Sequence, residues 1–364
     1  MTIAPKRIGL LTSGGDCAGL NAIMRAVVLR SAVLGWDVIG VLYGTLGLLT
    51  DPPQVRPLLP HHVDTVMMRQ GGTILGTTNK GDPFAYPMPD GSKKDRSEEI
   101  IANFRDLGCD ALIGIGDDGS LAILRRLAQQ GGIPLICVPK TIDNDVGMTE
   151  TAVGFDTAVS VATEALDRLQ PTAASHDRIM VLEVMGRGAG HIALAAGIAG
   201  GADVILVPEI PYDIQVVAAH LREIHRRGRN FGLVVVSEAV RTKDGAEVVN
   251  VLHGGEIRLG GVGHLIGAQI SELCQAETRV TVLGHVQRGG QPSAWDRLMA
   301  AAFGVHAVDL LNAGKSDRMV AWSQRGVTDV PIAEALKSPH PVEVNGSLVR
   351  VARGLGICLG DWTG

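Results

Sequence analysis

Short runs of Val, Ile and Leu recur along the chain and alternate with longer stretches whose apolar residues repeat every three or four positions. The short runs are typical of strands buried on both faces, and the longer stretches are typical of amphipathic helices. The expected strands are Ile8–Leu11, Val38–Leu42, Ala111–Ile115, Leu135–Val138, Ile179–Glu183, Val204–Val207 and Leu233–Val236. The expected helices are Asn21–Leu34, Glu98–Leu107, Ser120–Gln130, Thr157–Gln170, Ile214–Arg227, Gly263–Gln275 and Ala294–Asn312.

This alternation predicts the α/β fold class with mostly parallel sheets, because right-handed crossovers place helices on both faces of a parallel sheet. At about 150 residues per domain, the 364 residues predict two domains. The stretch Lys80–Asp95 contains three prolines and many charges, so we expect a long loop there, either a mobile lid or a plain connection.

Composition excludes several classes of function. The formal net charge is −5 and aromatic residues make up only 3%, which argues against nucleic-acid binding. The five cysteines are far apart and form no CxxC pair, which argues against a zinc site or a disulfide framework and is typical of a cytoplasmic protein. Glycines and Asp203 interrupt the apolar stretch Ile192–Val207, so we expect no membrane span.

Ligands of open parallel sheets bind beyond the carboxyl ends of the strands, so the residues that follow each strand are the informative ones. Thr12–Asp16 (TSGGD) follows the first expected strand and precedes a helix. Glycines at that place expose backbone N–H groups to an anion, and the helix dipole adds to the attraction. A tight turn that binds nothing is an equal alternative.

Gly114–Gly119 (GIGDDG) matches the GxGxxG pattern, and Asp143 lies about 20 residues further on, as in a dinucleotide-binding fold. However, Asp117 and Asp118 would repel the pyrophosphate of NAD unless a divalent cation lay between them. Mg²⁺ takes one or two carboxylates together with phosphate oxygens, so the pair favours a magnesium site. The simpler alternative for Asp118 is a helix cap.

Pro139–Asp145 (PKTIDND) follows the fourth expected strand and carries Asp143 and Asp145 together with a cation, Lys140, and a hydroxyl, Thr141. A carboxylate beside a phosphate donor is suited to taking the proton from an attacking alcohol. Any single Asp in this segment could instead form an Asx-turn.

Three later segments also follow strands. Met185–Gly190 (MGRGAG) places Arg187 among glycines, where a guanidinium could hold an oxyanion. Glu238 follows the last expected strand, and Arg279 precedes Gly284–Gly290 (GHVQRGG). His285 alone is as easily a structural histidine, whereas Arg288 beside two glycines indicates a ligand site.

Together these segments resemble the phosphofructokinase family, in order and in spacing, from about Arg7 to about residue 315. The resemblance implies two doubly wound Rossmann-like domains with a cleft between them. We expect a phosphate-donor domain of residues 1–154 plus about 287–337. The second expected domain, which would bind fructose 6-phosphate, has residues 155–286 plus about 338–364.

The resemblance also implies transfer of a phosphoryl group to the 1-hydroxyl of fructose 6-phosphate. Asp143 would be the base, with Asp145 beside it, and Thr141 would touch the sugar or the moving phosphate. Gly14 would lie against the donor, and Asp117 would hold Mg²⁺.

On the acceptor side, Arg187 would stabilise charge on the transferring group. The residues that the resemblance assigns to fructose 6-phosphate are Thr141, Asp143, Arg178, Met185, Gly186, Arg187, Glu238, Arg279, His285 and Arg288. Of these, Arg178 and Arg279 would come from a neighbouring subunit, so we expect a homodimer or homotetramer.

Asp118 and Lys140 determine the expected donor. Family members that use ATP usually have Gly at both positions, and the Asp–Lys pair resembles the pyrophosphate-dependent, mixed-substrate subgroup. Asp118 would occupy the place of the ATP α-phosphate, and Lys140 would bind the compact pyrophosphate. We therefore expect reversible transfer from pyrophosphate, with Mg²⁺, giving fructose 1,6-bisphosphate and phosphate in glycolysis or gluconeogenesis.

Three alternatives remain at this point. The first is an ATP-dependent enzyme with the same fold and acceptor. The second is a nicotinamide oxidoreductase that uses Gly114–Gly119 as its fingerprint. The third is a non-catalytic sugar-phosphate sensor, which would not need Asp143, Asp145 and Arg187.

Overall fold

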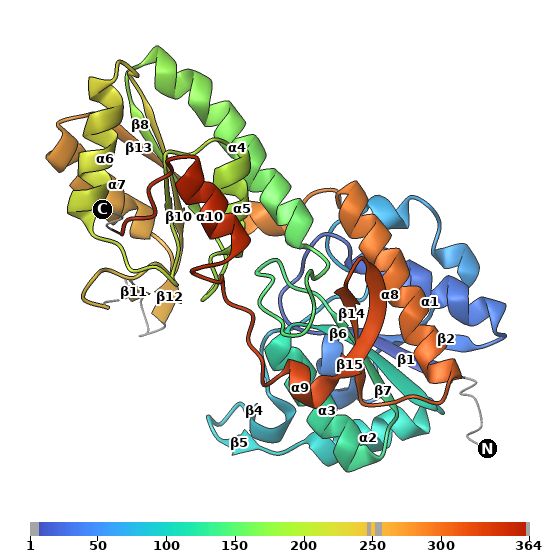
Figure 1. The fold of residues 1–364 in the computed structure, drawn as a ribbon. Coiled ribbons are helices and arrows are strands. Elements are labelled where there is room, and N and C mark those ends of the chain that lie inside the picture. The colour runs from blue at the N-terminus through green and yellow to red at the C-terminus, as the bar shows by residue number, and fades with distance from the viewer. Residues whose placement is uncertain (1–6, 246–248, 252–256, 362–364) are drawn as a thin grey trace. The chain divides into compact units, whose positions relative to one another are not determined.

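The computed structural model describes residues 7–245, 249–251 and 257–361, which fall into two compact units. Unit 1 comprises Met1–Asp156 and Arg288–Pro339, and unit 2 comprises Thr157–Gln287 and His340–Gly364 (Figure 1). The ends of the expected domain ranges, residues 1–6 and 362–364, lie outside the described residues. The donor and acceptor functions expected of the two domains remain predictions.

Unit 1 contains a seven-stranded sheet in the order β15-β14-β7-β6-β1-β2-β3. Its strands are β1 (Arg7–Thr12), β2 (Asp37–Val41), β3 (Val55–Pro57), β6 (Ala111–Gly116), β7 (Leu135–Pro139), β14 (Arg318–Ser323) and β15 (Gly326–Pro331). The five central strands are parallel, and β3 and β15 are antiparallel to their neighbours. The chain leaves β1 toward β2 on one side and resumes with β6 on the other, so a topological switch point lies between β1 and β6.

Helices cover both faces of this sheet (Figure 1). The helix pair α1 (Leu20–Val33) and α8 (Ala294–Asn312) packs together, and α2 (Ser97–Asp106) packs against α3 (Asp118–Gly131). The ring of Phe104 on α2 lies so close to β1 that a Cβ on Gly9 would be 2.4 Å from it. The shorter elements of unit 1 are η1 (Gly44–Leu49), η2 (Pro60–His62), η3 (Met67–Arg69), η4 (Pro83–Ala85) and α9 (Ile332–Ala335).

The stretch expected to be a long loop contains a small antiparallel hairpin, β4 (Tyr86–Pro87) and β5 (Lys93–Lys94). The guanidinium carbon of Arg126 lies 3.6 Å from the ring centroid of Phe84, just before the hairpin. The cation–π contact holds this segment against α3, and the pairing of β4 with β5 closes the hairpin.

Unit 2 contains a fully parallel four-stranded sheet in the order β13-β8-β10-β9. Its strands are β8 (Ile179–Val184), β9 (Val204–Leu206), β10 (Gly232–Ser237) and β13 (Thr278–Val282). Its helices are α4 (Phe155–Ser175), α5 (His191–Ala199), α6 (Ile214–Arg226), α7 (Val262–Cys274) and α10 (Ser347–Gly354). A separate pair, β11 (Val249–Val251) and β12 (Ile257–Leu259), is antiparallel.

Alternate residues of β8 face opposite sides of the sheet of unit 2. Val181 packs in a cluster with residues of α6 and α7, whereas Met180 packs with Ala173 of α4. Strands with apolar side chains on both faces are the reason that the sequence shows continuous Val, Ile and Leu runs.

The predicted α/β class with mostly parallel sheets is confirmed, and each of the seven expected strands is present to within one or two residues at its ends. The edge strand β13 was not expected, because it reads TRVTV and lacks a continuous apolar run. The pair β14–β15 was not expected either. Within the described part of the chain, no helix combines the length and the apolar character needed to cross a bilayer.

Gly304 offers a test of the contact between α1 and α8. A Cβ on Gly304 would lie 2.7 Å from the Cβ of Ala26 and 2.8 Å from the carbonyl oxygen of Ile23. We expect Gly304→Ala to lower the free energy of unfolding by about 1–3 kcal/mol, because backbone atoms cannot move aside cheaply. Urea denaturation measures this change.

The matched control is Gly354→Ala at the end of α10, where a Cβ would meet no heavy atom within 4 Å. We expect it to be neutral or to stabilise the protein by up to about 1 kcal/mol, because alanine favours helix. Equal effects of the two substitutions would contradict the close packing of α1 on α8.

Candidate active site

Three loops of unit 1 follow neighbouring parallel strands and therefore meet at one edge of the sheet. The segment Thr12–Asp16 begins at the last residue of β1. Asp117 follows β6, and Lys140–Asp145 follows β7. The first two of these strands flank the topological switch point, which is where open α/β sheets bind their ligands.

Gly14 has no room for a side chain. Its φ is +80°, and a Cβ there would lie 2.5 Å from Oδ2 of Asp117. Its N–H donates to the carbonyl of Thr78 at 3.0 Å, and the hydroxyl of Thr77 donates to the carbonyl of Gly14 at 2.7 Å. The first loop thus comes within contact distance of the second, which only glycine permits.

Lys140 is a buried cation that joins all three loops. Its side chain is only 2% exposed, its ammonium donates to the carbonyl of Gly15, and Nζ lies 3.8 Å from Oδ2 of Asp117. Burial lowers the pKa of Lys140, and the nearby Asp117 carboxylate opposes this shift. The ammonium is therefore directed at the protein's own backbone.

Arg288 holds the next carbonyl of the same loop. Its Nη1 donates to the carbonyl of Asp16 at 3.1 Å and would lie 2.7 Å from a Cβ on Gly15. Two cations, Lys140 and Arg288, thus fix two consecutive peptide groups. The structure places Arg288 in unit 1, whereas its expected contact with the sugar phosphate remains a prediction.

The acidic pair after β6 divides into two environments. Asp117 is the N-cap of α3, and its Oδ1 accepts from the backbone N–H of Ser120 at 3.0 Å. The carboxylate of Asp118 is exposed and accepts from the N–H of Gly119 at 2.7 Å. The helix-cap alternative considered for Asp118 is therefore wrong, because Asp117 makes that cap.

These two carboxylates fit a Mg²⁺ ion that also binds phosphate. The described residues contain no cluster of three or more His, Cys, Asp or Glu side chains suited to a metal ion. Mg²⁺ keeps several waters and is usually held by one or two carboxylates plus substrate phosphates, which is what Asp117 and Asp118 could supply.

The loop after β7 keeps its acidic residues in a fixed backbone. The hydroxyl of Thr141 accepts from the N–H of Asp143 at 3.0 Å. The side chain of Asn144, which has a φ of +54°, accepts from the N–H of Ala152 at 2.9 Å and donates to a carbonyl. Asp143 is 4% exposed and Asp145 is half-buried, so both carboxylates sit at defined places.

A second group of predicted residues lies at the carboxyl edge of the sheet of unit 2. Glu238 accepts from the N–H groups of Gly186 at 3.3 Å and Arg187 at 3.0 Å. Gln287 accepts from the N–H of Met185 at 2.7 Å. Arg187 has a φ of +48°, and its side chain is exposed, so the turn presents a guanidinium to solvent. His285 is exposed on η5 (Gly284–Arg288).

Arg178 and Arg279 lie away from that group. Arg178 directly precedes β8 and donates from Nε to Glu277 at 2.8 Å, and Arg279 also pairs with Glu277. Met185 follows the other end of β8, whose six residues span about 20 Å at roughly 3.3 Å per residue. One chain therefore does not bring Arg178 and Met185 together.

Several residues in these networks were not expected to take part. Thr77 and Thr78 bind the glycine loop, but they follow no strand, so the rule of residues after strands could not select them. Gln287 lies inside the GHVQRGG segment, where its uncharged side chain gives a weaker signal than those of His285 and Arg288. Glu277 precedes a strand, where no ligand site is expected.

Known proteins are similar to this sequence over nearly its full length. A protein from Synechocystis sp. named ATP-dependent 6-phosphofructokinase 1 is 61% identical over 357 residues, which cover 98% of this chain and 99% of its own. The protein of the same name from Nostoc sp. is 61% identical over 356 residues, with the same coverage. ATP-dependent 6-phosphofructokinase from Chloroflexus aurantiacus is 46% identical over 361 residues, covering 99% of both chains.

These relatives overturn the expected use of pyrophosphate and the assignment to the pyrophosphate-dependent subgroup, since their names specify ATP. The structure supplies a physical reason. Lys140 is buried against Gly15 and does not reach outward, and Asp118 is exposed.

Solved structures agree on the fold. Phosphofructokinase from Saccharomyces cerevisiae matches with a TM-score of 0.77 at 28% identity over 97% of this chain, which spans 47% of the yeast chain. Pyrophosphate-dependent phosphofructokinase from Nitrosospira multiformis matches with a TM-score of 0.78 at 22% identity over 99% of this chain and 93% of its own, a likeness of fold alone. Residues 7–311 match the family described as Phosphofructokinase, which argues against the nicotinamide interpretation of Gly114–Gly119. The chain belongs to the phosphofructokinase family.

Proposed function

We propose that this chain is an ATP-dependent 6-phosphofructokinase, which transfers the γ-phosphoryl group of ATP to the 1-hydroxyl of fructose 6-phosphate. The observation that carries the proposal is the 61% identity, over nearly the whole of both chains, to two proteins with that name. The site supports it with a glycine loop at the switch point and carboxylates on the neighbouring loops. The products are ADP and fructose 1,6-bisphosphate.

The loops after β1 and β6 form the donor side. Gly14 allows the backbone to approach the phosphates closely, and the N-terminus of α3 adds a favourable dipole. Asp117, with Asp118 beside it, would hold Mg²⁺. When bound, this ion neutralises charge on the phosphate oxygens. Lys140 acts indirectly, because its hydrogen bond to Gly15 fixes the loop that faces the phosphates.

The loop after β7 carries the base that accepts the proton. Asp143 takes the proton of the 1-hydroxyl as that oxygen bonds to the γ-phosphorus and the bond to the β–γ bridging oxygen breaks. Asp145 and the hydroxyl of Thr141 keep the base and the sugar in place. Arg187 stabilises negative charge on the group in transfer, and catalysis is mostly positioning and charge neutralisation.

The turn after β8 forms the acceptor side, where Met185, Gly186 and Glu238 contact the sugar together with His285 and Arg288. Arg178 and Arg279 contact the 6-phosphate of a substrate bound by another copy of the chain. The working unit is a homodimer or homotetramer, located in the cytoplasm.

The donor is tested in a coupled assay that supplies ATP or inorganic pyrophosphate at equal concentration, with fructose 6-phosphate and Mg²⁺. We expect turnover with ATP, less than about one hundredth of that rate with pyrophosphate, and loss of activity when EDTA removes the metal ion. Faster turnover with pyrophosphate than with ATP would sink the proposal.

The base is tested by Asp143→Asn, which keeps the size of the side chain but cannot accept the proton. We expect kcat to fall by about 10²–10⁴, while the KM for fructose 6-phosphate changes less than about threefold. Steady-state kinetics separate the two constants. A variant that retains near-wild-type kcat would show that another group takes the proton.

The role of Lys140 is tested by Lys140→Met, which keeps the length but removes the donor to Gly15. We expect the KM for ATP to rise at least tenfold and the free energy of unfolding to drop by about 1–3 kcal/mol, because a buried carbonyl loses its partner. The matched control is Lys315→Met, since that half-exposed ammonium pairs with Asp329 at 3.1 Å on the surface. We expect the control to leave KM unchanged, and equal effects of both variants would refute the anchoring role.

A further inference from the structure

Two carboxylates from neighbouring loops hold the turn after β8. Glu238, in the loop after β10, accepts from the N–H groups of Gly186 at 3.3 Å and Arg187 at 3.0 Å. Glu209, in the loop after β9, accepts from the N–H of Gly190 with both oxygens, at 3.0 and 3.1 Å. The strands β8, β10 and β9 are neighbours in a parallel sheet, so their loops lie at the same carboxyl edge. Glu238 is part of the proposed acceptor site, whereas Glu209 is not.

The backbone of this turn is unusual, and it needs support. Arg187 has a φ of +48°, a left-handed conformation that costs free energy for any residue except glycine. Gly186 has a φ of +147°, and the N–H of Ala189 donates back to its carbonyl at 3.0 Å. The side chain of Arg187 is exposed on this tight loop. The direction of its guanidinium therefore depends on how firmly the backbone is held.

The far end of the turn fits closely against Glu209. Gly190 is the N-cap of α5, and a Cβ there would lie 2.4 Å from the Cβ of Val207 and 2.8 Å from Oε2 of Glu209. Backbone N–H groups at the start of a helix lack intrahelical partners, and the helix dipole favours a negative charge there. Glu209 supplies both the acceptor and the charge, so it fixes the end of the turn and the start of α5 together.

The same carboxylate holds a third segment of the chain. Oε1 of Glu209 also accepts from the N–H of Val342 at 2.8 Å. Nε2 of His191, the first residue of α5, lies 2.8 Å from the carbonyl oxygen of His340, and it carries the proton because a carbonyl can only accept. Burial lowers the pKa of His191, which favours the neutral ring. The chain re-enters unit 2 at His340, so this returning segment is tied to the start of α5.

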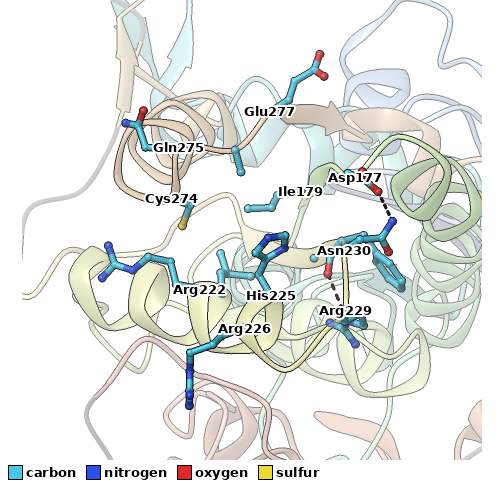
Figure 2. A pocket seen from close by; sticks show the side chains of 14 residues that line it. Asp177, Ile179, Arg222, His225, Arg226, Arg229, Asn230, Cys274, Gln275 and Glu277 are labelled. Carbon is cyan, nitrogen blue, oxygen red and sulfur yellow. Dashed lines mark hydrogen bonds between the residues drawn. The ribbon is translucent and has the colours of Figure 1, made fainter.

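Carboxylates at the opposite, amino edge of the sheet hold side chains instead. Asp177, just before β8, accepts from the side-chain amide of Asn230 (Figure 2). Glu277, just before β13, pairs with Arg178 at 2.8 Å. Glu209, in contrast, accepts from backbone N–H groups of two segments. Its contacts are those of a group that sets the path of the chain.

We propose that Glu209 is a positioning residue for the phosphoryl transfer, because its contacts with Gly190 and Val342 fix the backbone that carries Arg187. This inference rests on the role of Arg187 in the proposed function. Glu238 contacts the sugar in that function, so the turn needs a second anchor for which the substrate does not compete. Both oxygens of Glu209 are engaged by backbone N–H groups of buried residues. A displacement of about 1 Å in a catalytic group can cost about 10² in rate.

The kinetic test compares two substitutions of Glu209 in the full-length protein, assayed with ATP, fructose 6-phosphate and Mg²⁺. We expect Glu209→Ala to lower kcat at least about twentyfold and to change the KM for ATP less than about threefold. Glu209→Gln keeps one oxygen that can accept from both Gly190 and Val342, so we expect its kcat to stay within about fivefold of wild type. A glutamine variant as impaired as the alanine variant would contradict anchoring by hydrogen bonds.

Asp213→Ala is the matched control. Asp213 is a half-buried carboxylate of the same unit that caps α6, where it accepts from the N–H of Gln215 at 2.9 Å. We expect both alanine variants to lower the midpoint of thermal unfolding by about 2–4 °C, but only Glu209→Ala to lower kcat. Equal kcat values for the two variants would show that Glu209 is only a helix cap and would overturn the proposal.

A double-mutant cycle tests whether Glu209 acts through Arg187. We expect Glu209→Ala to lower kcat less than about threefold in an Arg187→Ala background, because residues that act as a unit have non-additive effects. A further twentyfold loss in that background would show that the two residues act independently, and the positioning role would be wrong.

Hydrogen exchange followed by mass spectrometry tests the anchor without any substrate. We expect Glu209→Ala to speed exchange in residues 186–192 of the unliganded protein at least about tenfold, and Asp213→Ala to leave it unchanged. Unchanged exchange in Glu209→Ala would overturn the proposal. Absence of turnover by the wild-type protein with ATP would instead refute the proposed function, and the exchange rates would still decide whether Glu209 anchors the turn.

Discussion

One buried ammonium holds together the three loops at the carboxyl edge of the unit 1 sheet. Lys140 belongs to the loop after β7, donates to Gly15 in the loop after β1 and lies 3.8 Å from Asp117 in the loop after β6. Removing a charge from water costs several kcal/mol, so such a group persists only where partners offset that cost. The carbonyl and the carboxylate do so here, and the three loops are consequently fixed relative to one another before any substrate binds.

This constraint explains why the neighbouring loops are so rich in glycine. Arg288 and Lys140 hold two consecutive carbonyls of the first loop, and Gly14, which directly precedes them, has a positive φ and lies against Asp117. A side chain at Gly14 would collide with the cap of α3. The sheet supplies the other half of the geometry, because β1 and β6 are adjacent parallel strands and deliver their loops to the same edge.

The sequence was most informative where one physical rule acts locally. Strands buried on both faces show continuous apolar runs, and ligand loops follow such strands, so the fold class and the main loops could be predicted. The edge strand β13 escaped because its side chains alternate in polarity. The donor prediction failed for a different reason: it assumed that Lys140 points at the ligand, and the direction of a side chain depends on tertiary packing. Asp117 and Asp118 likewise differ only in place, since one caps a helix and the other faces solvent.

The sheet of unit 2 separates Arg187 from the pair Arg178 and Arg279 by its own length. The turn that carries Arg187 lies at the carboxyl end of β8, and Arg178 lies at the amino end with Arg279, both held by Glu277. Six residues of extended strand, about 20 Å, cannot be shortened without breaking the pairing with β10 and β13. If Arg178 and Arg187 contact one and the same substrate, they must come from two copies of the chain. Glu277 would then prepare both arginines of one copy for the partner's site, because a shared carboxylate keeps the two guanidinium groups side by side in the absence of the phosphate that would replace it.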